Sequence, residues 1–255
     1  MTEQPEILVG TTRQGRVLII TLQREAKRNA FDRAMADALD GALNELDDDP
    51  DLWVGILASS GSVFSAGSDL TAGGDYVTAR GGEYGIVRRQ RMKPLIAAVE
   101  GAALGGGFEI VLSCDLIVAS ASARFGLPEV SIGVLATCAG LFRAPNALPL
   151  NVARELILTG VPIDAARAHG IGLVNRVTEP GEAVAGALEL AERICANAPV
   201  SVRASLRAIN EFVAAGDPLG WEKTGEALKL LAGSDDASEG ITAFLEKRPP
   251  VWKGR

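Results

Sequence analysis

The first 120 residues alternate between short strand-like apolar runs and one stretch with helical spacing. β-Branched residues on both sides of Arg13-Gln14-Gly15 predict two strands joined by a turn. Asp32 is a predicted helix N-cap, apolar residues recur at helical spacing from position 35 to 46, and Pro50 ends the helix. Continuous apolar runs at 52–59, 94–99 and 115–120 predict buried strands, and a short helix is predicted from about Gly106. This alternation indicates an α/β architecture.

The pattern becomes mostly helical after residue 150. Segments 151–160 and 164–170 read as helices that end at Gly160 and Gly170, each interpreted as a C′ glycine. One last strand is predicted at 172–177, and four successive helices follow over 181–199, 200–216, 217–233 and 234–248. The change near residue 198 predicts an α/β domain over 1–197 and a helical C-terminal region over 198–255.

Composition and charge narrow the class of protein. A chain of 255 residues with 47% hydrophobic and 22% charged residues is typical of a soluble globular protein. The net charge of -7 disfavours nucleic-acid and anionic-membrane partners. Three cysteines without a CxxC pair fit a reducing compartment, and the N-terminus shows no secretion signal. The most apolar window, 95–120, is too interrupted by charges and glycines to span a bilayer. We therefore expect a cytoplasmic location.

Several kinds of chemistry are disfavoured by missing motifs. No GxGxxG follows a strand, and no GxxxxGK[ST] is present, so neither a dinucleotide turn nor a P-loop is predicted. The single histidine, His169, precedes a predicted helix-end glycine, which makes a Ser-His-Asp triad and a zinc site improbable. We predict no metal site. The remaining candidates are carboxylates and backbone amides.

Three short segments carry that remaining chemistry. A helix that begins near Gly106 leaves its first N–H groups without intrahelical partners, close to Glu109 on the first turn. The other interpretation is a packing role for the glycines and a capping role for the acid. Glu129 is a second acid in an apolar context, and a tight turn at Gly67 would present the N–H of Ser68. Each segment has an ordinary structural explanation, but their combination favours a site.

These segments resemble a known family. The stretches "FSAGSDL" (64–70), "KPLIAAVEGAALGGGFEIVLSCDLIVASASARFGLPEVSIG" (93–133) and "AFLEKRPPVWKGR" (243–255) are similar to the enoyl-CoA hydratase/isomerase, or crotonase, family. The end of the chain and "FGLPEV" also resemble its carnitinyl-CoA dehydratase branch. The resemblance implies a crotonase-like spiral of ββα turns as the catalytic domain over 1–197. It also implies that 198–255 is an oligomerisation region that forms trimers, often paired into hexamers.

The resemblance also implies roles for individual residues. The Ser68 and Gly106 N–H groups would form an oxyanion hole, and Glu109 and Glu129 would be the catalytic carboxylates. Glu109 would orient and deprotonate water, and Glu129 would protonate C2. The substrate-binding residues would be Ala66 and Leu70 at the adenine of coenzyme A, Arg28 near its phosphates, and Phe244 and Lys247 at the coenzyme A of the same or a neighbouring subunit. Coenzyme A would enter as part of the substrate, with no separate cofactor.

The expected reaction is addition of water across the 2,3 double bond of a 2-enoyl-CoA, or its reverse. Two alternatives use the same scaffold, an enoyl-CoA isomerase and a carnitinyl-CoA dehydratase, and a third is a non-catalytic acyl-CoA-binding protein. The loop after Glu129 departs from the family pattern, because Thr137 and Ala139 replace glycines while Gly140 and Arg143 are retained. This departure leaves the acyl preference open. The long segment 71–91 is expected to border the acyl pocket.

Overall fold

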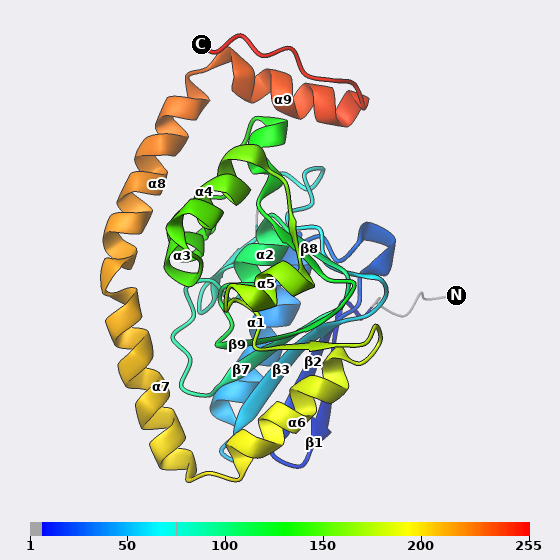
Figure 1. Cartoon of the computed structure of the whole chain (residues 1–255), viewed down its shortest axis with the longest axis vertical. Coiled ribbons are helices and arrows are strands. Elements are labelled where there is room, and N and C mark those ends of the chain that lie inside the picture. Colours follow the sequence, from blue (N-terminus) through cyan, green and yellow to red (C-terminus); the bar gives the residue numbers. More distant parts are fainter. Residues whose placement is uncertain (1–6, 75) are drawn as a thin grey trace.

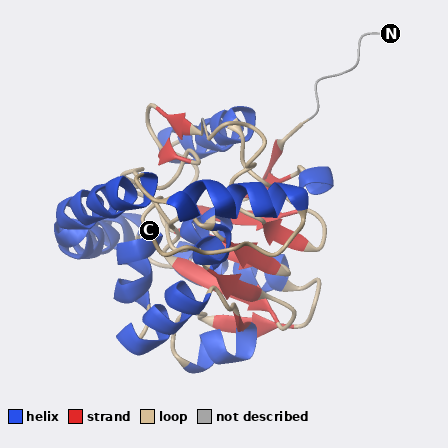
Figure 2. Ribbon diagram, turned by 90° about the horizontal axis from the view of Figure 1, so that it is seen from above, coloured by secondary structure: helices blue, strands red, loops and turns tan. Residues whose placement is uncertain are grey.

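Strands of the computed structural model form two main sheets. The structure describes residues 7–74 and 76–255. The first sheet has the order β1 (Val9–Gln14), β2 (Val17–Leu22), β3 (Val54–Ser59), β7 (Leu95–Val99), β9 (Leu116–Ser120) and β12 (Arg176–Thr178). The second has the order β11 (Ile163–Asp164), β10 (Arg124–Gly126), β8 (Ala102–Leu104) and β4 (Val63–Ser65), and β5 (Val77–Thr78) pairs with β6 (Gly82–Glu83). Figure 2 shows helices on several sides of the central strands.

The chain visits these two sheets in a repeating order. Each of β3, β7 and β9 lies in the six-stranded sheet, and the strand that follows it closely, β4, β8 or β10, lies in the four-stranded sheet. Neighbouring turns pair in parallel, as β3 with β7 and β8 with β10. Helix α2 (Gly106–Val111) follows β8, while the 3-10 helix η2 (Pro128–Ile132), α3 (Gly140–Ala147) and α4 (Leu150–Thr159) follow β10. The repeat is a spiral of ββα turns.

The first predicted elements form for the expected reasons. β1 and β2 pair antiparallel about a turn in which Gly15 has a positive φ of 58°. Helix α1 (Arg33–Asp48) begins where predicted, because the side chain of Asp32 accepts a hydrogen bond from the Met35 amide at 2.9 Å.

Apolar residues cover both faces of the six-stranded sheet. Val54, Ile56 and Ala58 of β3 face a small cluster that includes Ala183, Ala187 and Ala191 of α6 (Ala183–Cys195). Leu57, on the opposite face, belongs to the larger core that also contains the apolar side of α1. The small alanines, spaced four residues apart, let α6 lie close to the sheet.

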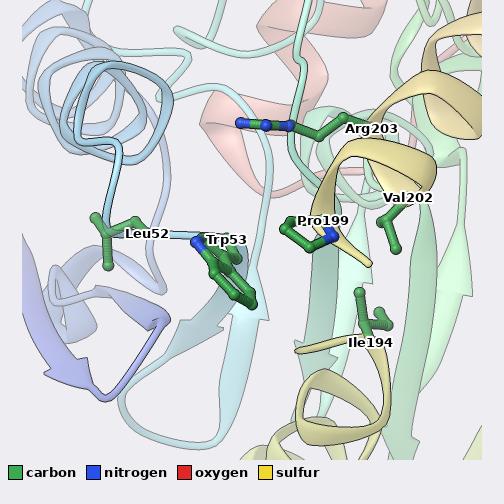
Figure 3. A pocket seen from close by; sticks show the side chains of 6 residues that line it. All are labelled: Leu52, Trp53, Ile194, Pro199, Val202 and Arg203. Carbon is green, nitrogen blue, oxygen red and sulfur yellow. The ribbon is translucent and has the colours of Figure 1, made fainter. Parts of the chain in front are cut away.

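The C-terminal helices leave this body. Figure 1 shows α7 (Pro199–Val213) and α8 (Asp217–Ala232) along one side of the molecule and α9 (Asp235–Glu246) across one end. Figure 3 shows the notch where α7 begins, lined by Leu52, Trp53, Ile194, Pro199, Val202 and Arg203. Helix α7 has no buried residue, and Phe212 and Leu230 are 83% and 82% exposed. These helices therefore keep large apolar side chains on the surface.

The structure corrects part of the sequence interpretation. Gly170 is the last residue of α5 (Ala165–Gly170) rather than a C′ residue, and the positive φ falls on Gly172 instead. The three-residue strands β4, β8 and β10 and helix α3 were not predicted. None of the helices within residues 7–74 and 76–255 is both long and apolar enough to cross a bilayer. The cytoplasmic location stays a prediction from the sequence.

Candidate active site

Glu109 is held inside the protein by α2. Gly105, with φ 55°, turns the chain from β8 into this helix, and its amide donates to the Gly126 carbonyl at 2.9 Å. Glu109 is only 2% exposed. Its Oε1 accepts a hydrogen bond from the Gly140 amide at 2.9 Å, at the start of α3. One oxygen of this buried carboxyl is thus fixed in direction by the main chain.

Glu129 approaches the same place from η2. A Cβ placed on Gly105 would lie 3.2 Å from Oε1 of Glu129, so this carboxyl lies beside the turn that starts α2. The other oxygen, Oε2, is buried and has no hydrogen-bond partner among the described residues. A buried carboxyl oxygen without a partner is costly, and such an atom points to a functional role.

The two carboxyls influence each other's protonation. Burial raises the pKa of Glu109 to about 8, and the negative charge of Glu129 adds to this rise. Burial also raises the pKa of Glu129 to about 7. Because both pKa values lie near or above neutrality and the charge of Glu129 raises the pKa of Glu109, the pair does not lose both protons at neutral pH. The site can therefore offer one acid and one base at the same time.

Two backbone amides lie close to this pair. Gly67 has φ 90°, and a Cβ there would lie 2.8 Å from the Gly106 nitrogen, so the Gly67–Ser68 turn contacts the start of α2. Phe31 pairs with both neighbours of Ser68, accepting from the Asp69 amide and donating to the Gly67 carbonyl, each at 2.8 Å. Among the hydrogen bonds of the described residues, none uses the amide of Ser68 or Gly106 as donor. Both amides remain available to an oxygen of a substrate.

The loop after Glu129 keeps its shape despite its unusual residues. Ala139 has φ 77°, the left-handed conformation that a glycine adopts without strain. Gly140 follows it and donates to Glu109. The replacement of glycine by Ala139 therefore adds local strain but preserves the amide that orients the carboxyl.

The expected coenzyme A residues form two groups. Arg28 and Ala66 are neighbours, because the Ala66 amide donates to the Arg28 carbonyl at 3.0 Å, and Leu70 is 40% exposed nearby in sequence. Phe244 and Lys247 lie at the end of α9, and Phe244 is 50% exposed. The structure shows no hydrogen bond between the two groups within the described residues.

Helix α9 contacts the segment that carries Glu129. A Cβ on Gly240 of this helix would lie 2.7 Å from the Gly133 nitrogen, just after η2. The backbones of α9 and η2 are therefore in direct contact.

The sequence interpretation missed two residues at the site. Tyr84 donates to, or accepts from, Ser68 Oγ at 2.7 Å, and Cys138 is 3% exposed and close enough to influence the pKa of Glu109. One signal was available, since both tyrosines of the chain fall in the segment 71–91. Neither the notch of Figure 3 nor a second hollow beside Glu100 and Arg124 includes Glu109 or Glu129.

Comparison with known proteins gives one consistent family. The family model described as enoyl-CoA hydratase/isomerase matches residues 12–255. A short-chain-enoyl-CoA hydratase of Clostridium acetobutylicum is 36% identical over 92% of this chain and 94% of its own. A carnitinyl-CoA dehydratase of Salmonella typhi is 38% identical over 96% of this chain and 97% of its own. The crystal structure of a carnitinyl-CoA hydratase from Mycobacterium avium superposes with a TM-score of 0.93, at 43% identity over 98% of this chain and 100% of that one.

Proposed function

This chain belongs to the enoyl-CoA hydratase/isomerase family, and we propose that it adds water across the 2,3 double bond of a 2-enoyl-CoA thioester. The observation that carries the proposal is the pair Glu109 and Glu129, both raised in pKa and beside two unused amides. An isomerase needs only one group to carry a proton between two carbons, whereas hydration needs a base for water and an acid for C2.

The two carboxyls divide this work by their surroundings. Hydration proceeds from the form of the pair in which Glu129 carries the proton. In that form Glu109 is ionised and oriented by the Gly140 amide, and it takes a proton from water as the water oxygen bonds to C3. The π electrons of the alkene move toward C2 and the thioester carbonyl. Glu129, protonated, then gives its proton to C2, for which its unpartnered oxygen is suited. Acid–base help of this kind contributes roughly 10²–10⁴-fold to the rate.

The amides of Ser68 and Gly106 stabilise the charge that collects on the thioester oxygen. Each such donor is worth about 2.7–4 kcal/mol in the transition state. Since the donors are main-chain groups, the Ser68 side chain can change more freely than Gly106 can. No separate cofactor takes part in this scheme, because coenzyme A is carried by the substrate.

We propose that coenzyme A binds next to the Ser68 turn. Ala66 and Leu70 follow β4 on either side of Ser68, and both are exposed, which supports their assignment to the adenine of coenzyme A. Arg28, adjacent to Ala66, then supplies a positive charge for the phosphates. Phe244 and Lys247 contribute from α9 of the same or a neighbouring subunit.

Hydration is tested with 2-butenoyl-CoA and the purified protein. We expect loss of the absorbance of the conjugated thioester and formation of 3-hydroxybutanoyl-CoA. Absence of turnover with every chain length tested, together with no dehydration of a 3-hydroxyacyl-CoA, would refute the proposal.

Carnitinyl-CoA dehydration is the second candidate. It is favoured by a relative named carnitinyl-CoA dehydratase at 38% identity and by the structure of a carnitinyl-CoA hydratase at 43% identity, each over nearly the whole chain. The two reactions share the same carboxyl chemistry and differ in the acyl group. Comparing kcat/KM for carnitinyl-CoA and 3-hydroxybutanoyl-CoA decides between them.

We also propose that the chain assembles as a homotrimer or a dimer of trimers through the region 198–255. Large apolar side chains such as Phe212, Leu219 and Leu230 are exposed on α7 and α8, and such surfaces mark interaction sites. Light scattering on the eluting protein is expected to give three or six times the chain mass. A monomeric mass would contradict this assembly.

A further inference from the structure

The two tyrosines of the chain meet at the candidate active site. Their rings stack with centroids 4.6 Å apart and an interplanar angle of 23°. The rings of Phe31 and Tyr84 pack edge to face with their centroids 5.4 Å apart, and Tyr84 is only 2% exposed. The result is a layer of aromatic rings beside the residues that would hold the thioester.

The hydroxyl of Tyr84 lies against both segments of the proposed oxyanion hole. It is 2.7 Å from Ser68 Oγ. A Cβ on Gly106 would collide with this hydroxyl and would lie 2.9 Å from ring carbon Cε2. Gly106 and Glu109 are three residues apart on α2, so their side-chain positions share one face of the helix. The ring of Tyr84 therefore occupies the Glu109 side of α2.

Electrostatic effects agree with this placement. Burial, with added effects of Cys138 and the negative charge of Glu109, raises the pKa of Tyr84 well above its usual value. The phenol stays protonated at neutral pH. Cys138 is also buried next to these groups, since its own pKa is raised by burial and by Glu109. Tyr84 and Cys138 are therefore both buried neighbours of the Glu109 carboxyl.

The backbone holds Tyr84 in an unusual conformation. Its φ is 55°, which is uncommon for a bulky residue, and Gly82 and Gly85 on either side have φ of 68° and 76°. Gly85 packs against α1, where a Cβ would lie 2.9 Å from the Asp40 amide. Strain at a position held by its neighbours is typical of functional sites.

The residues after Tyr84 are anchored on two elements. Arg88 pairs with Glu83 at 2.9 Å and stacks on Trp221 of α8, 3.6 Å from the ring centroid. Arg89 is buried and pairs with Asp40 of α1 at 2.6 Å. The segment after Tyr84 is therefore held both by α1 and by α8, and these contacts fix the position of Tyr84.

We propose that Tyr84, backed by Tyr76, ends the acyl pocket and makes the enzyme selective for short 2-enoyl groups. This inference rests on the proposed function. With the carbonyl held by Ser68 and Gly106 and the alkene beside the carboxyls, an acyl chain that continues much beyond C4 meets the aromatic layer. One methylene too many in a closed pocket changes specificity roughly 10–200-fold.

The test compares kcat/KM for 2-butenoyl-, 2-hexenoyl- and 2-decenoyl-CoA. We expect the wild-type protein to prefer butenoyl over decenoyl by about tenfold or more. Tyr84→Gly removes the wall without adding backbone strain at φ 55° and should raise the relative rate with decenoyl-CoA about tenfold or more. Tyr84→Phe is the matched control, because it keeps the ring and should keep the wild-type ranking of chain lengths.

Tyr76→Ala provides an independent variant that leaves the strained residue in place. It should shift the ranking in the same direction by a smaller factor. Equal rates with all three substrates in the wild type, or an unchanged ranking in both folded Tyr76 and Tyr84 truncation variants, would overturn the inference while leaving hydration intact. No hydration of any substrate by the wild type would instead refute the proposed function, and with it the inference.

Discussion

The segments that carry Glu109 and Glu129 place the same side chain in different surroundings. Glu109 sits on α2, is 2% exposed, and accepts a main-chain hydrogen bond from Gly140 at 2.9 Å. Glu129 sits on η2, and its buried Oε2 has no partner among the described residues. A fixed acceptor suits the orientation of water, and an unpartnered oxygen suits proton delivery. In the proposed mechanism, chemically identical groups therefore take different tasks because their neighbours differ.

Of all the changes considered, loss of either carboxyl should lower the rate of hydration most. Glu109→Gln and Glu129→Gln are each expected to lower kcat for hydration by roughly 10²–10⁴-fold, because each removes the base or the acid. The double variant should be little worse than the singles, since the two groups act as a unit. Steady-state rates with 2-butenoyl-CoA measure this. If one variant keeps near wild-type hydration, the division of labour between the two glutamates is wrong.

Gly140→Ala should displace the Glu109 carboxyl and leave Glu129 in place. A Cβ there would lie 2.8 Å from Glu109 Oε1 and 2.7 Å from the Ala136 Cβ, so the carboxyl must move. Misplacement of about 1 Å can cost up to about 10²-fold, and we expect this loss in kcat with little change in KM. Ala139→Gly is the control, because it relaxes a residue at φ 77° without adding an atom near Glu109. Similar losses in both variants would contradict the specific role of Gly140.

Gly240→Ala should displace Glu129 indirectly, through the contact between α9 and η2. The added Cβ would lie 2.7 Å from the Gly133 nitrogen, so α9 and η2 must separate. We expect about a tenfold loss of kcat through displacement of Glu129. Gly225→Ala on α8, where a Cβ would meet nothing within 4 Å, is the matched control. Full activity of a folded Gly240→Ala protein would show that α9 does not position η2.

The smallest effect concerns the dependence of stability on pH. The pKa of Glu109 is raised by burial from 4.5 to about 8, so the folded protein retains a proton between these values that the unfolded chain has released. This contribution to stability is complete below about pH 4.5 and is lost as pH rises through about 8. Glu109→Gln should therefore gain in Tm relative to wild type between pH 6 and 8.5, by about 2–4 °C for each kcal/mol. A constant difference in Tm across this range would contradict the raised pKa.

Much of the fold could be predicted because its signals are local. The Asp32 cap, the Gly15 turn and the four C-terminal helices depend on residues within a few positions of each other. Strands β8 and β10 were missed because three residues are too few to show a periodicity. Their stability comes from pairing with each other across about twenty positions of sequence. The prediction that Gly170 is a C′ residue was wrong because a second glycine, Gly172, follows two positions later and takes the positive φ after α5.

Site residues that belong to a sequence motif could be predicted, whereas those that reach the site through contacts between distant segments could not. Motifs identify Glu109, Glu129, Ser68 and Gly106, and the structure brings their segments together. The Gly140 hydrogen bond was not visible, because it joins residues 31 positions apart. Tyr84 was hidden in a glycine-rich segment, since its place against Gly106 depends on a left-handed backbone and on rings from distant segments.

The position of a single deuterium atom tests the central claim most directly. If Glu129 delivers a solvent-derived proton to C2 while Glu109 activates water, hydration of 2-butenoyl-CoA in deuterium oxide yields 3-hydroxybutanoyl-CoA with one carbon-bound deuterium, at C2. Proton magnetic resonance and mass spectrometry of the product locate it. Deuterium at C4 of recovered enoyl-CoA, without any 3-hydroxyacyl product, would instead show a one-carboxyl double-bond shift and contradict the account.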